Sequence, residues 1–243
     1  MNKIEKAFLS KIRTKIGKSI DRYQLIKKDD KVLVGLSGGK DSLILLENLA
    51  WRKKVKQENF EIIAVYIDIL NIPYEANTKY LKDFCEKWEV QFIHKRLQDE
   101  IDLNASEKNP CFVCSWDRRK HLFQIAEELK CNKLALGHHL DDAIETLLMN
   151  MMYQANISSI PPILRMFDGD LYAIRPLIET KESDLIKYAE IQEYQTMIKT
   201  CPFEKVSSRQ FVREILQQME NKYDRAKNNI YHAMSNINKE YLP

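Results

Sequence analysis

Apolar runs alternate with amphipathic helical segments along this chain, and that alternation limits its fold more than any other feature. The apolar runs occupy residues 31–36, 61–69, 90–97, 133–137, 163–166 and 172–176. Strands that alternate with helices pair in parallel, because each crossover helix packs back onto the sheet. We therefore expect an α/β fold with a twisted parallel sheet of about five strands and helices on both faces.

Composition and charge narrow the class of protein further. The 243 residues are 44% hydrophobic and 30% charged, with 6 Gly and 7 Pro, which excludes collagen-like and mostly disordered chains. No apolar run approaches the roughly 18 residues of a membrane span, and charges interrupt the first residues, where a secretory signal would be apolar. We expect a cytoplasmic protein that binds no membrane. The net charge of +3 permits a nucleic-acid partner without requiring one.

The motif SGGKDS joins the first strand to the following helix. It consists of Ser37, Gly38, Gly39, Lys40, Asp41 and Ser42. The glycines let the backbone turn tightly, so its N–H groups and the helix N-terminus form a site for an anion. Lys40 adds positive charge, and Asp41 either caps the helix or helps to hold a metal ion. The motif is neither GxxxxGK[ST] nor GxGxxG, and it predicts a phosphate-binding loop of another kind.

A second motif, GHHLDD at residues 137–142, follows the fourth expected strand. The carboxyl ends of parallel strands meet at one edge of a sheet, where ligands gather. We therefore expect Gly137, His138, Asp141 and Asp142 on the same edge as residues 37–42.

The five cysteines do not suggest a disulfide framework, because their number is odd and the expected compartment is reducing. Cys111 and Cys114 form a CxxC pair, and Cys201 precedes a polar helix. The residues alone leave a zinc site, a redox pair and an iron–sulfur site open. Cys85 and Cys131 lie in apolar surroundings and are expected to be packing thiols.

The strand followed by SGGKDS resembles the pyrophosphate loop of the PP-loop ATPases, also called adenine nucleotide alpha hydrolases. In that family ATP is cleaved between its α and β phosphates, and AMP is transferred to a substrate oxygen, which then leaves readily. The resemblance implies ATP and Mg²⁺ at residues 37–42 and nucleotide contacts from Gly137 and His138. It also implies catalytic roles for Lys40 and Asp141.

Nearly the whole chain, about residues 10–235, is similar to the tRNA 2-thiocytidine synthetase family. The similarity rests on CFVC with the basic helix after it, on GHHLDD, MNMMYQ, IPPIL and AIRPL, and on the late Cys201. It implies a [4Fe-4S] cluster on Cys111, Cys114 and Cys201, and Arg118 as a further catalytic residue that faces nucleotide or tRNA.

The same resemblance implies a reaction and its partners. The expected reaction is ATP-dependent thiolation of a tRNA base carbonyl, at cytidine C2. The expected partners are tRNA and a sulfur donor, either sulfide or the persulfide of a cysteine desulfurase, and the chain forms a homodimer if it follows many members. One departure concerns sulfur relay: the later cysteine pair of the family is incomplete, because Glu204 stands where its second cysteine would be.

An alternative remains open, namely an adenylating or amidating enzyme similar to lysidine synthetase, with a structural zinc and no sulfur transfer. In either case we expect three parts. They are a basic amphipathic helix at residues 1–30, a PP-loop nucleotide-binding domain with a CxxC insertion at 31–200, and a helical segment at 201–243.

Overall fold

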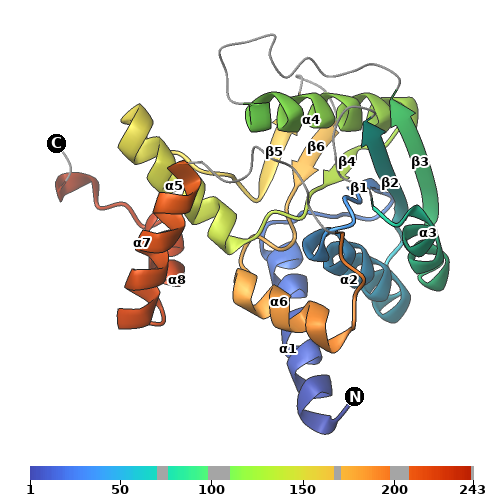
Figure 1. Cartoon of the computed structure of the whole chain (residues 1–243), viewed down its shortest axis with the longest axis horizontal. Helices are drawn as coiled ribbons and strands as arrows, with labels where there is room; N and C mark the ends of the chain where they lie inside the picture. Colours follow the sequence, from blue (N-terminus) through green and yellow to red (C-terminus); the bar gives the residue numbers. More distant parts are fainter. Residues whose placement is uncertain (70–75, 98–109, 167–170, 198–207, 242–243) are drawn as a thin grey trace.

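Six strands form one sheet in the order β3-β2-β1-β4-β6-β5 (Figure 1). The structure is a computed structural model, and it describes residues 1–69, 76–97, 110–166, 171–197 and 208–241. The strands are β1 (Lys31–Gly35), β2 (Glu61–Ile69), β3 (Gln91–Leu97), β4 (Lys133–Ala135), β5 (Ile163–Met166) and β6 (Leu171–Ile174). All neighbours pair in parallel except the edge strand β5, which runs antiparallel to β6. The expected parallel α/β sheet is confirmed, with one antiparallel strand more than the alternation required.

Eight helices accompany the sheet in the part of the chain that the structure describes. They are α1 (Lys3–Arg22), α2 (Lys40–Lys56), α3 (Thr78–Lys87), α4 (Pro110–Glu128), α5 (Leu140–Gln154), α6 (Glu182–Ile191), α7 (Ser208–Lys222) and α8 (Ala226–Ala233). The expected N-terminal helix is confirmed as α1, and α7 and α8 confirm the helical character of the C-terminal part.

Alternate residues of each strand supply two hydrophobic layers, as the period of a β-strand requires. Val32 and Val34 of β1 point into a layer shared with α1, α2, α3 and α6. Leu33, between them, points into the opposite layer, which is closed by α4. Helices therefore cover both faces of the sheet, and α4 lies alone on its side in Figure 1.

A third hydrophobic cluster lies beyond the sheet, where α7 and α8 pack against α5. Ile144 of α5, Val212 and Leu216 of α7 and Tyr231 of α8 are buried in it. The C-terminal helices are thus fixed to the helix that begins within the GHHLDD motif.

The CxxC pair lies on a helix, which corrects one expectation from the sequence. Residues 98–114 read as irregular, with a helix starting near Asp117, but α4 already begins at Pro110. Proline is favourable in the first turn of a helix, because its fixed φ is helical and its missing N–H would have no helical partner there. Residues 98–109 lie outside the described part of the chain.

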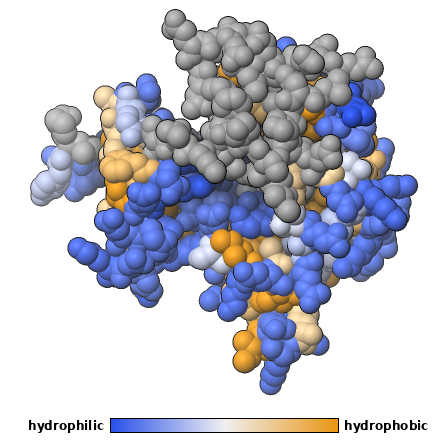
Figure 2. Space-filling model, viewed as in Figure 1, coloured by the Kyte–Doolittle hydropathy of each residue, from blue (hydrophilic) through white to orange (hydrophobic). Residues whose placement is uncertain are grey.

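The surface in view is largely hydrophilic over α7 and α8, and apolar side chains gather near the end of α5 (Figure 2). Met151, Met152 and Tyr153 of α5 are each about half exposed there. Among the described helices none combines the length and the apolar character that crossing a lipid bilayer requires.

Candidate functional site

The SGGKDS loop turns sharply at Gly38, which has a φ of +82°. A Cβ at this position would lie 2.9 Å from the Cβ of Ala76, so both the conformation and the space require glycine. The carbonyl of Gly38 accepts a hydrogen bond of 3.0 Å from the amide of Met197. The loop is therefore held by segments far from it in the sequence.

Two serines brace the loop from inside. The hydroxyl of Ser42 donates to the Gly39 carbonyl at 2.9 Å and accepts from the Ser37 amide at 3.2 Å. Gly39 is the N-cap of α2, and no side chain caps that helix, so the expected capping role of Asp41 is wrong. An uncapped helix start leaves N–H groups and the positive end of the helix dipole available to an anion.

The two sequence motifs touch. A Cβ on Gly137 would lie 3.2 Å from the carbonyl carbon of Asp41 and 3.3 Å from the amide nitrogen of Ser42. Only a residue without a side chain lets the backbones approach so closely. The structure thus brings residues 37–42 and 137–142 together at the carboxyl edge of the sheet, as the strand order predicted.

Lys40 and Asp41 lie at this contact. The Nζ of Lys40 is 3.1 Å from Oε1 of Glu182 and 3.3 Å from Oδ2 of Asp41. Burial works against the charge, but these two carboxylates raise the pKa of Lys40 above its usual range. Burial also raises the pKa of Asp41. The Oδ1 atom of Asp41 is buried and has no hydrogen-bond partner, so the donor that fits a bound Mg²⁺ is Asp41.

Asp141, by contrast, has both oxygens engaged. Its Oδ2 accepts from the Glu182 amide at 2.7 Å, and its Oδ1 is 2.6 Å from Nζ of Lys227. Burial disfavours the charged form, yet these hydrogen bonds lower the pKa of Asp141. The carboxylate is therefore fixed in position by α6 and α8. Lys227 and Glu182 carry no sequence signal of this role, because both are remote from Asp141 in the chain.

The remaining histidines and arginine of this edge fall into two groups. His139, for which the sequence suggested no role, is the N-cap of α5 and exchanges capping hydrogen bonds with Asp142. The neighbouring His138 has a buried Nδ1 without a partner. Arg175, just after β6, was open between a core ion pair and a ligand contact. Its Nη1 donates to the Pro161 carbonyl at 2.7 Å, and it forms no ion pair with any residue in the described ranges.

The described cysteines also fall into two groups, those on α4 and those buried in the hydrophobic core. Cys114 is half buried in the first turns of α4, and Arg118 follows it by one turn. Cys111 is on the same helix, three residues earlier, a spacing that places two residues on one helix face. The side chain of Cys111 and the whole of Cys201 lie outside what the structure describes.

Two further thiols are fully buried. Burial raises the pKa of Cys85 to about 12 and that of Cys131 to about 11, so both thiols are protonated at neutral pH, as expected of packing thiols. The assignment of Cys111, Cys114 and Cys201 to a metal site remains a prediction from the sequence.

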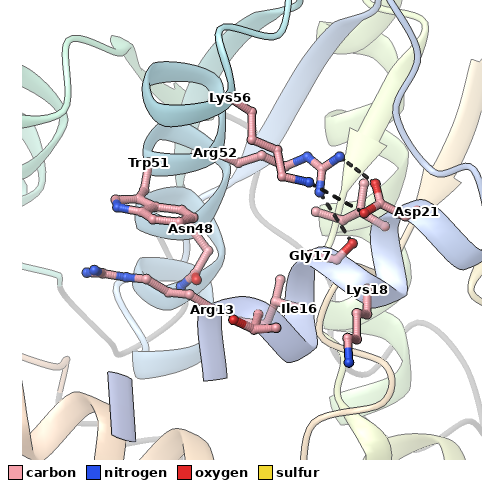
Figure 3. A pocket seen from close by; sticks show the side chains of 11 residues that line it. Arg13, Ile16, Gly17, Lys18, Asp21, Asn48, Trp51, Arg52 and Lys56 are labelled. Atoms are coloured by element: carbon pink, nitrogen blue, oxygen red, sulfur yellow. Dashed lines mark hydrogen bonds and ion pairs between the residues drawn. The ribbon is translucent and has the colours of Figure 1, made fainter. Parts of the chain in front are cut away.

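A cavity of about 180 Å³ lies elsewhere, between α1 and α2. Figure 3 shows Arg52 of α2 turned toward Asp21 and the Gly17 carbonyl of α1. Arg13 lies 5.3 Å from the ring centroid of Trp51. No residue predicted as functional from the sequence lines this cavity.

Comparisons with known proteins agree with this geometry. The PP-loop domain model matches residues 8–220 of the chain. The tRNA-cytidine(32) 2-sulfurtransferase of Alcanivorax borkumensis is 36% identical over 241 residues, which cover 98% of this chain and 83% of the relative. The chain belongs to the PP-loop family, in its tRNA 2-thiocytidine synthetase branch of transferases. The resemblance inferred from the motifs is thereby confirmed.

Two other comparisons extend the result. This PP-loop protein is 35% identical over 240 residues to the tRNA-cytidine(32) 2-sulfurtransferase of Paraburkholderia phytofirmans, over 96% of this chain and 70% of that one. The U34-tRNA thiolase NcsA from Methanococcus maripaludis, solved with its [4Fe-4S] cluster, superimposes with a TM-score of 0.79 at 27% identity, over 98% and 81% of the two chains. A site made by the PP-loop edge and α4 is therefore the candidate site of this protein.

Proposed function

We propose that this PP-loop protein is an ATP-dependent tRNA sulfurtransferase that adenylates a base carbonyl, cytidine C2, and replaces its oxygen by sulfur. The observation that carries the proposal is the close approach of Gly137 to the backbone of Asp41, where a Cβ on residue 137 would lie 3.2 Å from the Asp41 carbonyl carbon. It joins the phosphate loop to Asp141 at one edge. The names of its relatives support tRNA as the substrate, and tRNA places the enzyme in the cytoplasm, where thiols stay reduced.

The first half of the reaction is assigned to residues 37–42. ATP lies with its pyrophosphate part against the N–H groups of the loop and of α2. The cytidine O2 attacks the α-phosphorus, the bond to the β-phosphate oxygen breaks, and pyrophosphate leaves. Lys40 neutralises charge on the phosphates, and Asp41 holds Mg²⁺ through its unpartnered Oδ1. Positioning and charge neutralisation supply most of the acceleration in such reactions.

The second half is assigned to the α4 side. Hydrosulfide attacks C2, a proton is released as the C=S bond forms, and the C–O bond breaks as AMP leaves with the electron pair. A [4Fe-4S] cluster held by Cys111, Cys114 and Cys201 would supply an open iron that keeps sulfide bound and protected. Arg118, one turn after Cys114 on α4, faces the departing phosphate or the tRNA.

The covalent chain limits how far Cys201 can lie from the phosphate loop. Met197 donates to the Gly38 carbonyl, and four residues of chain span at most about 14 Å. This limit supports a common site for the nucleotide and the third thiol.

Nucleoside mass spectrometry of tRNA from a strain that lacks the protein tests the proposal. We expect 2-thiocytidine to disappear and to return with the wild-type chain. Cys111→Ala, Cys114→Ala and Cys201→Ala should each leave less than about 1% of it, since a missing ligand removes the site of the sulfur. Cys131→Ala, at a buried thiol, is the matched control and should restore the modification.

Two results would contradict the proposed function. An unchanged thionucleoside profile would exclude cytidine thiolation, and full activity of Cys201→Ala would remove the three-ligand arrangement. Anaerobic purification adds an independent reading. A colourless protein that still exchanges ATP and pyrophosphate would favour the enzyme similar to lysidine synthetase.

A further inference from the structure

Arg175 is a buried arginine whose guanidinium group has few partners among the described residues. It is 8% exposed, its Nη1 donates to the Pro161 carbonyl at 2.7 Å, and its Nε is buried with no hydrogen-bond partner. No ion pair to it exists within the described residues. Buried guanidinium groups are ordinarily paired, because removing a charge from water is costly. The side chain therefore has an unfilled requirement for an anion.

The position of Arg175 follows from the sheet. Ala135 of β4 pairs with Ile174 of β6, and the Leu136 amide donates to the Ile174 carbonyl at 3.0 Å. Ile174 belongs to the layer of α2, so the next residue points to the opposite face, which α4 covers. Arg175 thus lies at the carboxyl edge on the side of the CxxC helix.

Arg119 and His138 interact electrostatically with Arg175. Burial first, and then repulsion from Arg119 of α4, lowers the pKa of Arg175 to about 10, which still leaves it charged at neutral pH. Burial lowers the pKa of His138 to about 4, so its ring is neutral. Both Arg175 and Arg119 contribute to that shift. Arg175, Arg119 and His138 therefore lie within electrostatic reach of one another, and the buried Nδ1 of His138 has no hydrogen-bond partner among the described residues.

We propose that Arg175 and His138, with Arg119 beside them, hold a nucleotide phosphate group at the α4 side of the sheet edge, namely the phosphate that stays on AMP. The inference rests on the proposed function. Arg175 is too deeply buried to reach the phosphate backbone of a docked RNA duplex. Gly137, which precedes His138, touches the phosphate loop, so one nucleotide spans both sites, with pyrophosphate on the loop and the AMP phosphate at Arg175.

Binding of three separate probes to the full-length protein tests this assignment. In Arg175→Met the affinity for AMP should fall at least about tenfold, because a charge-assisted and bidentate contact is lost. The affinity for pyrophosphate should stay within about twofold of wild type. Arg175→Lys keeps the charge without the planar fork and should bind AMP with intermediate affinity. Arg22→Met, at an exposed arginine, is the matched control.

Melting temperatures separate a binding role of Arg175 from a structural one. Because the cation is uncompensated, Arg175→Met should melt at the same temperature as the wild type or higher without ligand. The rise in melting temperature on adding AMP should disappear. A clear drop in melting temperature without ligand would overturn the inference, because the arginine would then act mainly through Pro161.

The remaining outcomes are also decisive. Unchanged AMP affinity in Arg175→Met would overturn the inference, whether or not the affinity for tRNA changes. A wild-type protein that binds neither ATP nor AMP would overturn the proposed function itself.

Discussion

Arg52 and Arg175 are arginines with almost the same burial, 7% and 8% exposed, in two regions of the molecule. Arg52, at the contact of α1 and α2, lies 2.5 Å from an oxygen of Asp21 and 2.6 Å from one of Glu58. Arg175, at the carboxyl edge, has a single carbonyl acceptor. The difference teaches that two equally buried arginines can differ in their partners, and that the partners, more than the burial, separate an arginine that joins two helices from a candidate for ligand binding.

Two carboxylates of α2, Glu47 and Asp41, differ in the same way in how many of their oxygens have partners within the described residues. Glu47 of α2 is fully buried and accepts hydrogen bonds from Arg13, Tyr188, Gln192 and Tyr194. Asp41, two turns earlier on the same helix, has a buried oxygen with no partner. The buried carboxylate between α1, α2 and α6 is therefore satisfied within the protein, whereas Asp41 at the edge keeps an oxygen with no partner among the described residues.

The largest effect on stability is expected at Glu47, whose carboxylate accepts hydrogen bonds from α1 and α6. Glu47→Leu should lower the free energy of unfolding by about 4 kcal/mol, because it leaves the Arg13 guanidinium and three polar groups without their acceptor. Chemical denaturation measures this change. Glu47→Gln keeps an acceptor oxygen and should cost clearly less. Equal losses for Leu and Gln would show that the carboxylate is not what holds α1 and α6 to α2.

A substitution of Lys40, at the carboxyl edge of the sheet, should affect activity much more than stability. Lys40→Met should reduce ATP–pyrophosphate exchange about 100-fold, since a cation that neutralises the phosphates is lost. Its free energy of unfolding should change by less than about 1 kcal/mol, because its ion pairs are partly exposed. Lys54→Met, in the last turn of the same helix, is the control. Exchange at wild-type rates in Lys40→Met would remove Lys40 from the reaction.

A third expected effect is a dependence of stability on pH. Burial lowers the pKa of His138 from 6.5 to about 4, so between these values the unfolded chain binds a proton that the folded protein does not. The stability from the neutral ring is complete above pH 6.5 and is lost as the pH falls toward 4.

Thermal unfolding at a series of pH values measures that loss, which should be about 3 kcal/mol in the wild type. His138→Gln should flatten the curve across this window, and His232→Gln, at an exposed position, controls for the change of residue type. The same slope in His138→Gln and wild type would show that another group causes the loss.

The sequence predicted the sheet and both motifs of the edge because these depend on local patterns. Residues 31–36 read as a buried strand through composition, and the glycines of SGGKDS mark a turn. The meeting of Gly137 with Asp41 followed from the rule that parallel strands end at one edge. The start of α4 was wrong, since a CxxC has no helical periodicity and Pro110 reads equally well as a loop residue.

The partners of Asp141 and the isolation of Arg175 could not have been predicted from the sequence. Lys227 is separated from Asp141 by most of the last three helices, so only tertiary packing brings the ammonium group to the carboxylate. The absence of a counter-charge at Arg175 depends on every residue around it, and no local pattern encodes such a set.

The bond between Lys227 and Asp141 ties the last helix of the chain to the chemistry of the sheet edge. Exchanging α7 and α8 with those of a relative would thus also exchange an ammonium group that fixes a motif acid. A substitution at either position of the pair therefore removes a contact that holds α8 to the GHHLDD motif.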